Sequence, residues 1–285
     1  MEDRLSLGLK EETLAGSPWT RRVRDYVVSR QNDDGGYTFV QTTASNTQDT
    51  FYGLAILDLL SVPFPNIMQT VSWLSEFVPD NLYSHYYVAK ALRLCDETPQ
   101  RSLRTFLLSI ISSQRGFGTI DAYVEVDSEF EATFMVTELA HIAGVEIDRE
   151  KTINWLMSFR NKDGGFGAHR HSNLNSTYHA VASLFNLDYP VKSLKTTLAY
   201  ARACEKSSGG FAVIPRSSSP YMEHVYYGVS TLDLLGEKAR YTDKTAQFVF
   251  ECQNANGGFA RSDLGISTFE DTFYAVSILR KIGKL

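Results

Sequence analysis

The sequence predicts an all-α protein, an (α/α)6 toroid in which six helical hairpins close into an inner and an outer ring of helices. Three observations lead to this prediction. A glycine–aromatic turn returns along the chain, an aromatic residue precedes it at a fixed distance, and an apolar segment with helical spacing follows it. The repeats run from about residue 18 to residue 285, so we expect one toroid domain over residues 1–285. Repeats of this kind bury their apolar faces by stacking on their neighbours.

The turn combines two adjacent glycines with an aromatic residue. Its clear copies are QNDDGGYTF (31–39), NKDGGFGAH (161–169), KSSGGFAVI (206–214) and NANGGFARS (254–262). A degenerate copy is SQRGFGTID (113–121). Glycine avoids a side-chain clash where the chain reverses sharply. We expect the aromatic residue that follows to fill the gap between helices.

The predicted outer helices precede these turns. An aromatic residue stands nine positions before the first glycine of each clear copy, and these residues are Tyr26, Trp155, Tyr200 and Phe248. Trp73 and Phe106 extend the series, and successive members are 33 to 49 residues apart. Such intervals suit a unit of two helices and a turn.

The predicted inner helices follow the turns. Their segments are DTFYGLAIL, SHYYVAKAL, EATFMVTEL, STYHAVASL, HVYYGVSTL and DTFYAVSIL. Apolar residues recur every three or four positions, which indicates helix, and Asp, Ser or Thr near each start can cap it. An open solenoid needs polar capping repeats. Because neither terminal repeat differs from the middle ones, we predict that the ring closes.

One register of the inner helices predicts a central cavity. Aligned, they share a position held by Tyr52, Tyr87, Phe134, His179, Tyr227 and Tyr274. Three residues earlier stand Asp49, Ser84, Glu131, Ser176, His224 and Asp271, and three residues later stand Ala55, Lys90, Thr137, Ala182, Ser230 and Ser277. Residues three apart share a helix face, so we expect a polar mouth, an aromatic wall and room beneath it. Packing of the rings between neighbouring helices is the alternative.

Composition excludes several classes of protein. The net charge of -5 gives no electrostatic support for nucleic-acid binding. The most apolar stretch, FYGLAILDLLSVPF, is interrupted by Asp58 and Pro63 and is too short for a transmembrane segment. The three cysteines are too scattered for a disulfide framework or a zinc finger. Without the apolar core of a signal peptide at the N-terminus, we expect a cytoplasmic protein.

The repeats resemble those of protein prenyltransferase β-subunits and, more distantly, of terpene cyclases. The residues that carry the resemblance are QNDDGGY, QNANGGF, DGGFGAH and RGFGTIDAYVEVDSEFEATF, and the similarity extends from about Trp19 to Leu285. It implies a cavity open at the N-termini of the inner helices that binds an isoprenoid diphosphate. Aromatic walls would hold the prenyl chain, and helix N-termini with basic side chains would hold the diphosphate. It also implies a separate helical partner subunit.

The chain departs from this family at the residues that bind metal. The resemblance implies an Asp-x-Cys pair at the start of the fifth inner helix and a His at the start of the sixth. Here these positions hold Tyr221, Glu223 and Asp271, so a thiolate zinc site is not expected. The set of Glu223, His224 and Asp271 would suit Mg²⁺ or Mn²⁺. Capping of the helix N-termini by the two acidic residues is the alternative.

The diphosphate site also differs from the family pattern. Only Arg216, just beyond its glycine turn, can replace the arginine that the resemblance implies. His169, Arg170 and His171 lie near it in the expected fold. We therefore expect these basic side chains to hold the diphosphate, and a solvated loop is the alternative for HRHSN (169–173).

The sequence favours prenyl transfer but leaves other functions open. The expected function is a prenyltransferase-like toroid that binds an isoprenoid diphosphate or another apolar ligand. A terpene cyclase is an alternative, although its Asp-x-Asp-Asp acid motif is missing. The acidic cluster of Glu125, Asp127, Glu129 and Glu131 would suit a carbohydrate-active toroid or a metal site, and a solvated acidic loop is the alternative that we favour for it. A non-catalytic toroid that binds lipid or protein is a further alternative, because the usual zinc ligands are absent.

Overall fold

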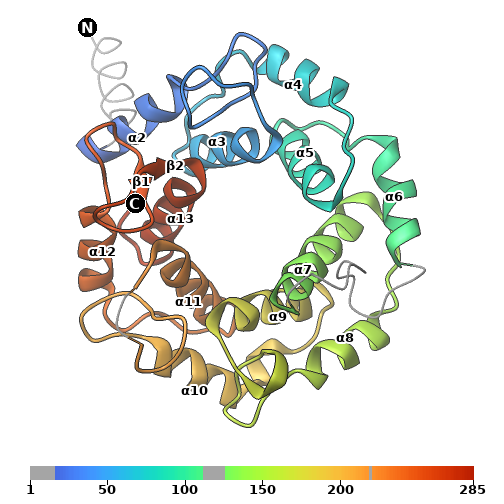
Figure 1. Ribbon diagram of the computed structural model, residues 1–285, viewed down its shortest axis with the longest axis vertical. Coiled ribbons are helices and arrows are strands. Elements are labelled where there is room, and N and C mark those ends of the chain that lie inside the picture. The colour runs from blue at the N-terminus through green and yellow to red at the C-terminus, as the bar shows by residue number, and fades with distance from the viewer. Residues whose placement is uncertain (1–16, 112–125, 218–219) are drawn as a thin grey trace, which may run out of the picture.

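The protein forms two concentric rings of helices (Figure 1). The computed structural model describes residues 17–111, 126–217 and 220–285. These segments contain twelve α-helices, six in each ring. The predicted (α/α)6 toroid is therefore confirmed. The degenerate turn at 113–121 lies outside the described part of the chain.

The inner ring is closed. Its helices are α3 (Thr47–Leu59), α5 (Leu82–Leu94), α7 (Val126–Ala143), α9 (Leu174–Asn186), α11 (Met222–Leu234) and α13 (Phe269–Lys281). Each packs against the next, and α13 packs against α3. Residues on nearly every side of these helices are buried, as expected of helices enclosed by protein.

The outer ring covers the inner one. Its helices are α2 (Pro18–Val28), α4 (Ile67–Glu76), α6 (Arg101–Ile111), α8 (Arg149–Ser158), α10 (Lys195–Cys204) and α12 (Thr242–Glu251). Each contacts the inner helix that follows it in the chain. The connections contain two short 3-10 helices, η1 (Ala168–Arg170) and η2 (Val191–Ser193), and one antiparallel hairpin of β1 (Phe259–Ala260) and β2 (Ser267–Thr268).

The glycine turns join one repeat to the next. At Gly35, φ is +87°, and an added Cβ would lie 2.4 Å from the backbone of Gln69 at the start of α4. The first glycines of the turns before α9 and α11 meet α10 and α12 in the same way. The last turn meets the first outer helix, since a Cβ on Gly257 would lie 2.2 Å from the carbonyl oxygen of Arg22 in α2. The repeated turn therefore closes the outer ring.

Hydrogen bonds explain the other residues of the turn. The side-chain amide of Gln31 donates to the carbonyl oxygens of Gly35 (3.1 Å) and Pro65 (3.0 Å). The amide of Gly36 donates to the carboxylate of Asp34 at 2.9 Å. In the turn before α9, Gly165 donates to the carboxylate of Asp163 at 3.0 Å, and in the turn before β2, Gly258 donates to the side-chain oxygen of Asn256 at 3.0 Å.

The aromatic residue of each turn lies between helices, as expected. Tyr37, Phe166, Phe211 and Phe259 are fully buried. A Cβ on Gly53 of α3 would lie 3.1 Å from the ring of Tyr37, and a Cβ on Gly228 of α11 would lie 2.2 Å from the ring of Phe211. These inner-helix glycines make room for the rings.

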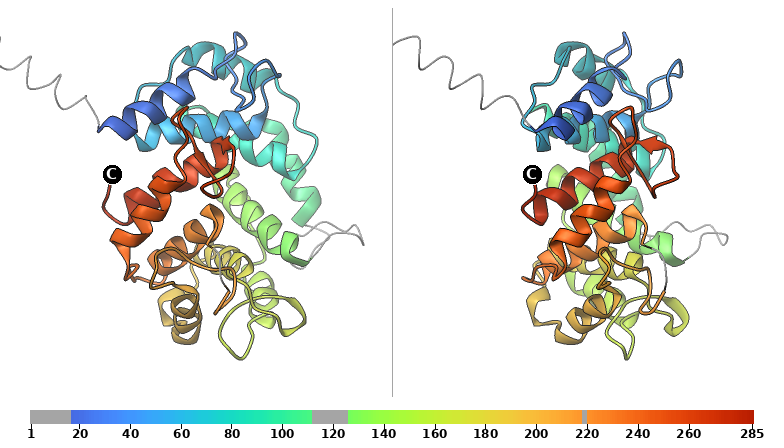
Figure 2. Two further views of the ribbon diagram at one scale, coloured as in Figure 1. Left: turned by 60° about the vertical axis from the view of Figure 1, so that its left-hand side comes forward. Right: turned by 90° about the vertical axis from the view of Figure 1, so that its left-hand side faces the viewer.

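The ring has two distinct faces. Loops that carry glycine turns lie on the face at which the inner helices begin, and the C-terminus lies on the opposite face (Figure 2). No helix in the described part of the chain has the length and apolar character needed to cross a membrane. All three cysteines are buried and unpaired.

Gly257→Ala should destabilise the fold more than Gly144→Ala. Both glycines have positive φ, so alanine is strained at either position by about 1–2 kcal/mol. A Cβ at Gly257 meets the backbone of α2, whereas one at Gly144 meets nothing within 4 Å. We expect Gly257→Ala to lower the free energy of unfolding in urea by at least about 2 kcal/mol more than Gly144→Ala does. Equal losses would contradict the assigned role of this contact in ring closure.

Candidate functional site

The six predicted ring positions meet at the centre of the toroid. They surround a hollow of about 140 Å³, which we call the central hollow. The side chains concerned are Tyr52, Tyr87, Phe134, His179, Tyr227 and Tyr274. The predicted aromatic wall is thus present in the structure, and its role in binding stays a prediction.

Five more aromatic residues line the same hollow, and the sequence interpretation missed them. Each directly precedes one of the predicted positions: Phe51, Tyr86, Tyr178, Tyr226 and Phe273. Consecutive residues of a helix are about 100° apart, so both can flank the inward direction. The sequence signal for them is that an aromatic residue directly precedes five of the six predicted positions, in the pairs FY, YY, YH, YY and FY. We call these eleven residues the aromatic girdle.

The girdle also packs helix against helix. Ring centroids of Tyr52 and Tyr87 are 5.7 Å apart, and those of Tyr227 and Tyr274 are 6.0 Å apart. Tyr52 and Tyr274, 6.3 Å apart, connect α13 back to α3. These spacings are typical of stabilising aromatic pairs. Cavity lining and interhelical packing, which the sequence offered as alternatives, are therefore both present.

Charged groups lie within the girdle. Lys90 Nζ is 2.9 Å from Glu138 Oε2, which also accepts a hydrogen bond from the hydroxyl of Tyr86. The ammonium of Lys90 stands 5.4 Å from the ring centroid of Tyr86 and 5.7 Å from that of Phe51. Burial, followed by the charge of Glu138, raises the pKa of the Tyr86 phenol well above its usual range. Tyr86 therefore acts as a neutral donor at ordinary pH.

A larger cavity of about 740 Å³ lies beneath the girdle, and we call it the lower cavity. Phe51, Lys90, Glu138 and Phe273 are shared by both spaces. The other walls come mainly from the last turns of α3, α5, α7 and α9. Room beneath the aromatic wall was expected. The position of this larger space was not expected, because the resemblance implied a cavity at the N-termini of the inner helices and the lower cavity lies at their C-terminal ends.

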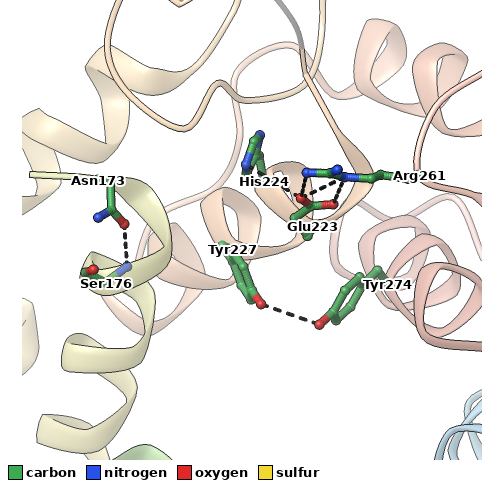
Figure 3. Close-up of polar contacts among 7 residues, drawn as sticks. All are labelled: Asn173, Ser176, Glu223, His224, Tyr227, Arg261 and Tyr274. Carbon is green, nitrogen blue, oxygen red and sulfur yellow. Dashed lines mark hydrogen bonds and ion pairs between the residues drawn. The ribbon is translucent and has the colours of Figure 1, made fainter. Parts of the chain in front are cut away.

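The acidic rim residues have partners within the protein. Arg261, just after β1, donates to both carboxylate oxygens of Glu223 at 2.9 Å (Figure 3). Its guanidinium lies 4.2 Å from the ring centroid of Tyr221. Asp271 is engaged at the start of α13, where Thr268 Oγ1 donates to its carboxylate at 2.8 Å. Within the described segments, no three His, Cys, Asp or Glu side chains are grouped to hold a metal.

His224 is the third residue of the set expected at this rim. Its Nε2 lies 3.8 Å from the carboxylate of Glu223, and burial lowers the pKa of its imidazole. Glu223 and His224 therefore lie side by side, while Glu223 pairs with a guanidinium and Asp271 accepts a hydrogen bond at a helix start. Metal binding by Glu223, His224 and Asp271 stays a prediction.

The observed helix caps stand three residues before the polar residues from which capping was expected. Asn173 accepts a hydrogen bond from the amide of Ser176 at 2.7 Å and so caps α9 (Figure 3). Asn46 and Asn81 cap α3 and α5 in the same way, and Thr268 caps α13. The polar residues predicted three positions before the girdle are thus mainly the third residues of capped helices.

The predicted diphosphate side chains lie away from both central spaces. Arg216 is exposed and lines a separate surface pocket of about 290 Å³ beside the end of α10. His169 and Arg170 are exposed in and beside η1. All three have positive φ, in loops that continue beyond their glycine turns. The cationic side chains that line the lower cavity are instead Lys90 and Arg93.

The acidic cluster of the carbohydrate-active alternative is described only in part. Glu125 and the side chain of Asp127 lie outside the described part of the structure. Glu131 lines the central hollow and accepts a hydrogen bond from the hydroxyl of Tyr83 at 3.1 Å. Burial is the main cause that raises the pKa of Glu131.

Asp271→Asn should change how stability depends on pH. Burial raises the pKa of Asp271 from 3.8 to about 6, so the folded protein keeps a proton that the unfolded chain loses at lower pH. Stability contributed by this group therefore falls as the pH rises from about 4 to about 6. Urea unfolding at several pH values measures the free energy of unfolding. Over this pH range it should fall in the wild type by up to about 3 kcal/mol more than in Asp271→Asn. The exposed Asp263→Asn is the control, and parallel curves for wild type and Asp271→Asn would refute the effect.

Solved structures of known proteins share this fold. Candida albicans protein geranylgeranyltransferase-I complexed with GGPP has a TM-score of 0.66 and 15% sequence identity, over 96% of this chain and 89% of that chain. The type II terpene cyclase MstE from Scytonema, as its R337A variant in complex with geranylgeranyl dihydroxybenzoate, has a TM-score of 0.60 and 13% identity. That match covers 94% of this chain and 97% of the cyclase chain. At these identities the likeness concerns the fold alone.

Sequence comparison identifies the family. A search of curated proteins finds no match. The family model of the prenyltransferase alpha-alpha toroid domain matches residues 9–121, 75–220 and 129–285, which together span nearly the whole chain. Geometry and sequence agree, because the matched repeats are the hairpins that build the two rings. The chain belongs to the prenyltransferase alpha-alpha toroid domain family.

Proposed function

We propose that this toroid binds an isoprenoid diphosphate in the lower cavity, with the prenyl chain against the underside of the aromatic girdle. The observation that supports this most directly is the cavity of about 740 Å³ bounded by Phe51 and Phe273. Small-molecule sites commonly have volumes of about 300–1,000 Å³. The central hollow, at about 140 Å³, is too small for a full prenyl chain.

The lining of the lower cavity offers apolar surface and a guanidinium, beside the carboxylates of Asp58, Glu138 and Asp188. Leu59, Leu94 and Ile142 offer apolar surface, and burial of a prenyl chain gains about 0.8 kcal/mol per CH₂. Lys90 is neutralised by Glu138, whereas Arg93 forms no ion pair with any residue that the structure describes. A guanidinium can bind a phosphate through two parallel hydrogen bonds. We therefore assign the diphosphate to Arg93.

The choice of an isoprenoid follows the two structural neighbours. Their complexes hold GGPP and geranylgeranyl dihydroxybenzoate. Binding is proposed here in preference to zinc-assisted prenyl transfer, because Glu223 and Asp271 stand at the implied ligand positions and are engaged with Arg261 and Thr268. A helical partner subunit stays a prediction.

Filling the lower cavity should abolish binding. Ile142→Trp adds bulk to its wall, whereas Ile266→Trp adds the same bulk to an exposed position on the β1–β2 hairpin. Calorimetry with geranylgeranyl diphosphate should show binding to the wild type and to Ile266→Trp, and none to Ile142→Trp. An unaffected Ile142→Trp variant would place the ligand elsewhere, and absence of binding to the wild type would refute the proposal.

Removing the cavity guanidinium should affect only the charged ligand. We expect Arg93→Gln to weaken binding of geranylgeranyl diphosphate by about tenfold or more, as for a lost charge-assisted hydrogen bond. Binding of the uncharged alcohol geranylgeraniol should change little, because its chain contacts remain. Arg216→Gln serves as the matched control, since this exposed arginine does not line the lower cavity. A larger effect of Arg216→Gln would favour the diphosphate position expected from the sequence.

A further inference from the structure

The upper end of the central hollow, where the inner helices begin, is anionic. Glu131 of α7 lines the hollow. Glu270 of α13 accepts hydrogen bonds from the hydroxyls of Tyr52 at 3.0 Å and Tyr274 at 2.9 Å. Neither carboxylate forms an ion pair with a lysine or arginine in the part of the chain that the structure describes. A diphosphate would be repelled here, and a cation would be attracted.

Both carboxylates act on tyrosines that line the hollow. After burial, the negative charge of Glu270 contributes to the raised pKa of Glu131. Both charges also raise the pKa of the phenols of Tyr87 and Tyr227, which line the hollow between them. The carboxylates of α7 and α13 therefore lie within electrostatic range of the same tyrosine rings.

The girdle already holds one cation of its own. The ammonium of Lys90 lies over the rings of Tyr86 and Phe51 and is paired with Glu138. Aromatic faces attract cations within about 6 Å of the ring centroid. Four other tyrosines that line the hollow have no lysine or arginine over their rings among the described residues, and these are Tyr52, Tyr87, Tyr227 and Tyr274. The hollow thus combines open ring faces with two carboxylates that have no lysine or arginine partner in the described part of the chain.

The volume of the hollow limits the ligand. A cavity of about 150 Å³ can hold a molecule of the size of benzene, and the hollow has about 140 Å³. A trimethylammonium group has a similar size. Removing such a cation from water is costly unless carboxylates or ring faces replace the lost solvation, and both are present here.

We propose that the central hollow binds a small organic cation, a trimethylammonium or similar alkylammonium group, close to Glu131 and Glu270. Its methyl groups lie against the rings of Tyr52, Tyr87, Tyr227 and Tyr274. The site is separate from the lower cavity and goes beyond the isoprenoid binding proposed above. One toroid thus offers an apolar, arginine-bearing site below the girdle and a cation site within it.

The first test compares two ligands of the same shape and different charge. Choline chloride and its uncharged isostere 3,3-dimethyl-1-butanol are titrated into the full-length protein by calorimetry at low salt. We expect choline to bind at least about tenfold more tightly, because only choline interacts with the carboxylates and the ring quadrupoles as a cation. Equal affinity for the two compounds, or no binding of choline, overturns the proposal.

Variants that preserve side-chain shape test the assigned carboxylates. Glu131→Gln and Glu270→Gln should each weaken choline binding about tenfold, whereas Glu251→Gln on the exposed surface of α12 should not change it. Lys90→Met removes the internal ammonium and should tighten choline binding about threefold or more, since it removes like-charge repulsion. Unchanged affinity in both carboxylate variants overturns the proposal.

A parallel titration separates this proposal from the preceding one. Geranylgeranyl diphosphate is titrated into the same wild-type, Glu131→Gln and Glu270→Gln samples. Loss of choline binding with retained diphosphate binding supports two separate sites. Binding of choline without any binding of the isoprenoid supports the cation site and refutes only the proposed isoprenoid function.

Discussion

The contact between each glycine turn and the next outer helix is the constraint on which the rest of the structure depends. No Cβ can be accommodated at Gly35 or Gly257, because the backbone of the neighbouring repeat occupies that space. Every such contact fixes the position of one hairpin relative to the next. The last of these contacts is made with α2, the first outer helix, so the six hairpins together must form a closed ring. A closed ring then obliges the inner helices to point one face at a shared centre.

That shared centre meets two physical demands with the same residues. Neighbouring inner helices need large side chains to fill the wedge between them, and aromatic rings supply much area with few rotatable bonds. A ring of six helices also leaves space on its axis. The girdle narrows that space to about 140 Å³ and separates it from a cavity of about 740 Å³ below. Lys90 and Glu138 border both spaces and bring charge into a mainly aromatic layer.

Local sequence patterns predicted the architecture because each repeat carries several independent signals, namely the turn, the aromatic residue at a fixed spacing and the helical period of apolar residues. Trp73 could be placed in an outer helix although its turn has lost the glycines, since the spacing of the other repeats fixed its position. The ring position of Tyr227 and Tyr274 followed from the same register. Phe51 and Phe273 were missed because only one inward residue per turn was considered, although two adjacent residues of a helix can both border an axis.

The sequence by itself determined the helices, the closed ring and half of the aromatic girdle, since these follow from periodicity and from steric limits that act within one repeat or between neighbours. Only the tertiary structure decided the partners of the rim residues. Arg261 neutralises Glu223 from a hairpin in the next repeat, and the loop containing Arg216 lies beside α10 instead of at the centre. Such pairings depend on the path of long loops, and the helical period of the sequence does not predict that path. The position of the lower cavity likewise depends on how four helix ends meet in space.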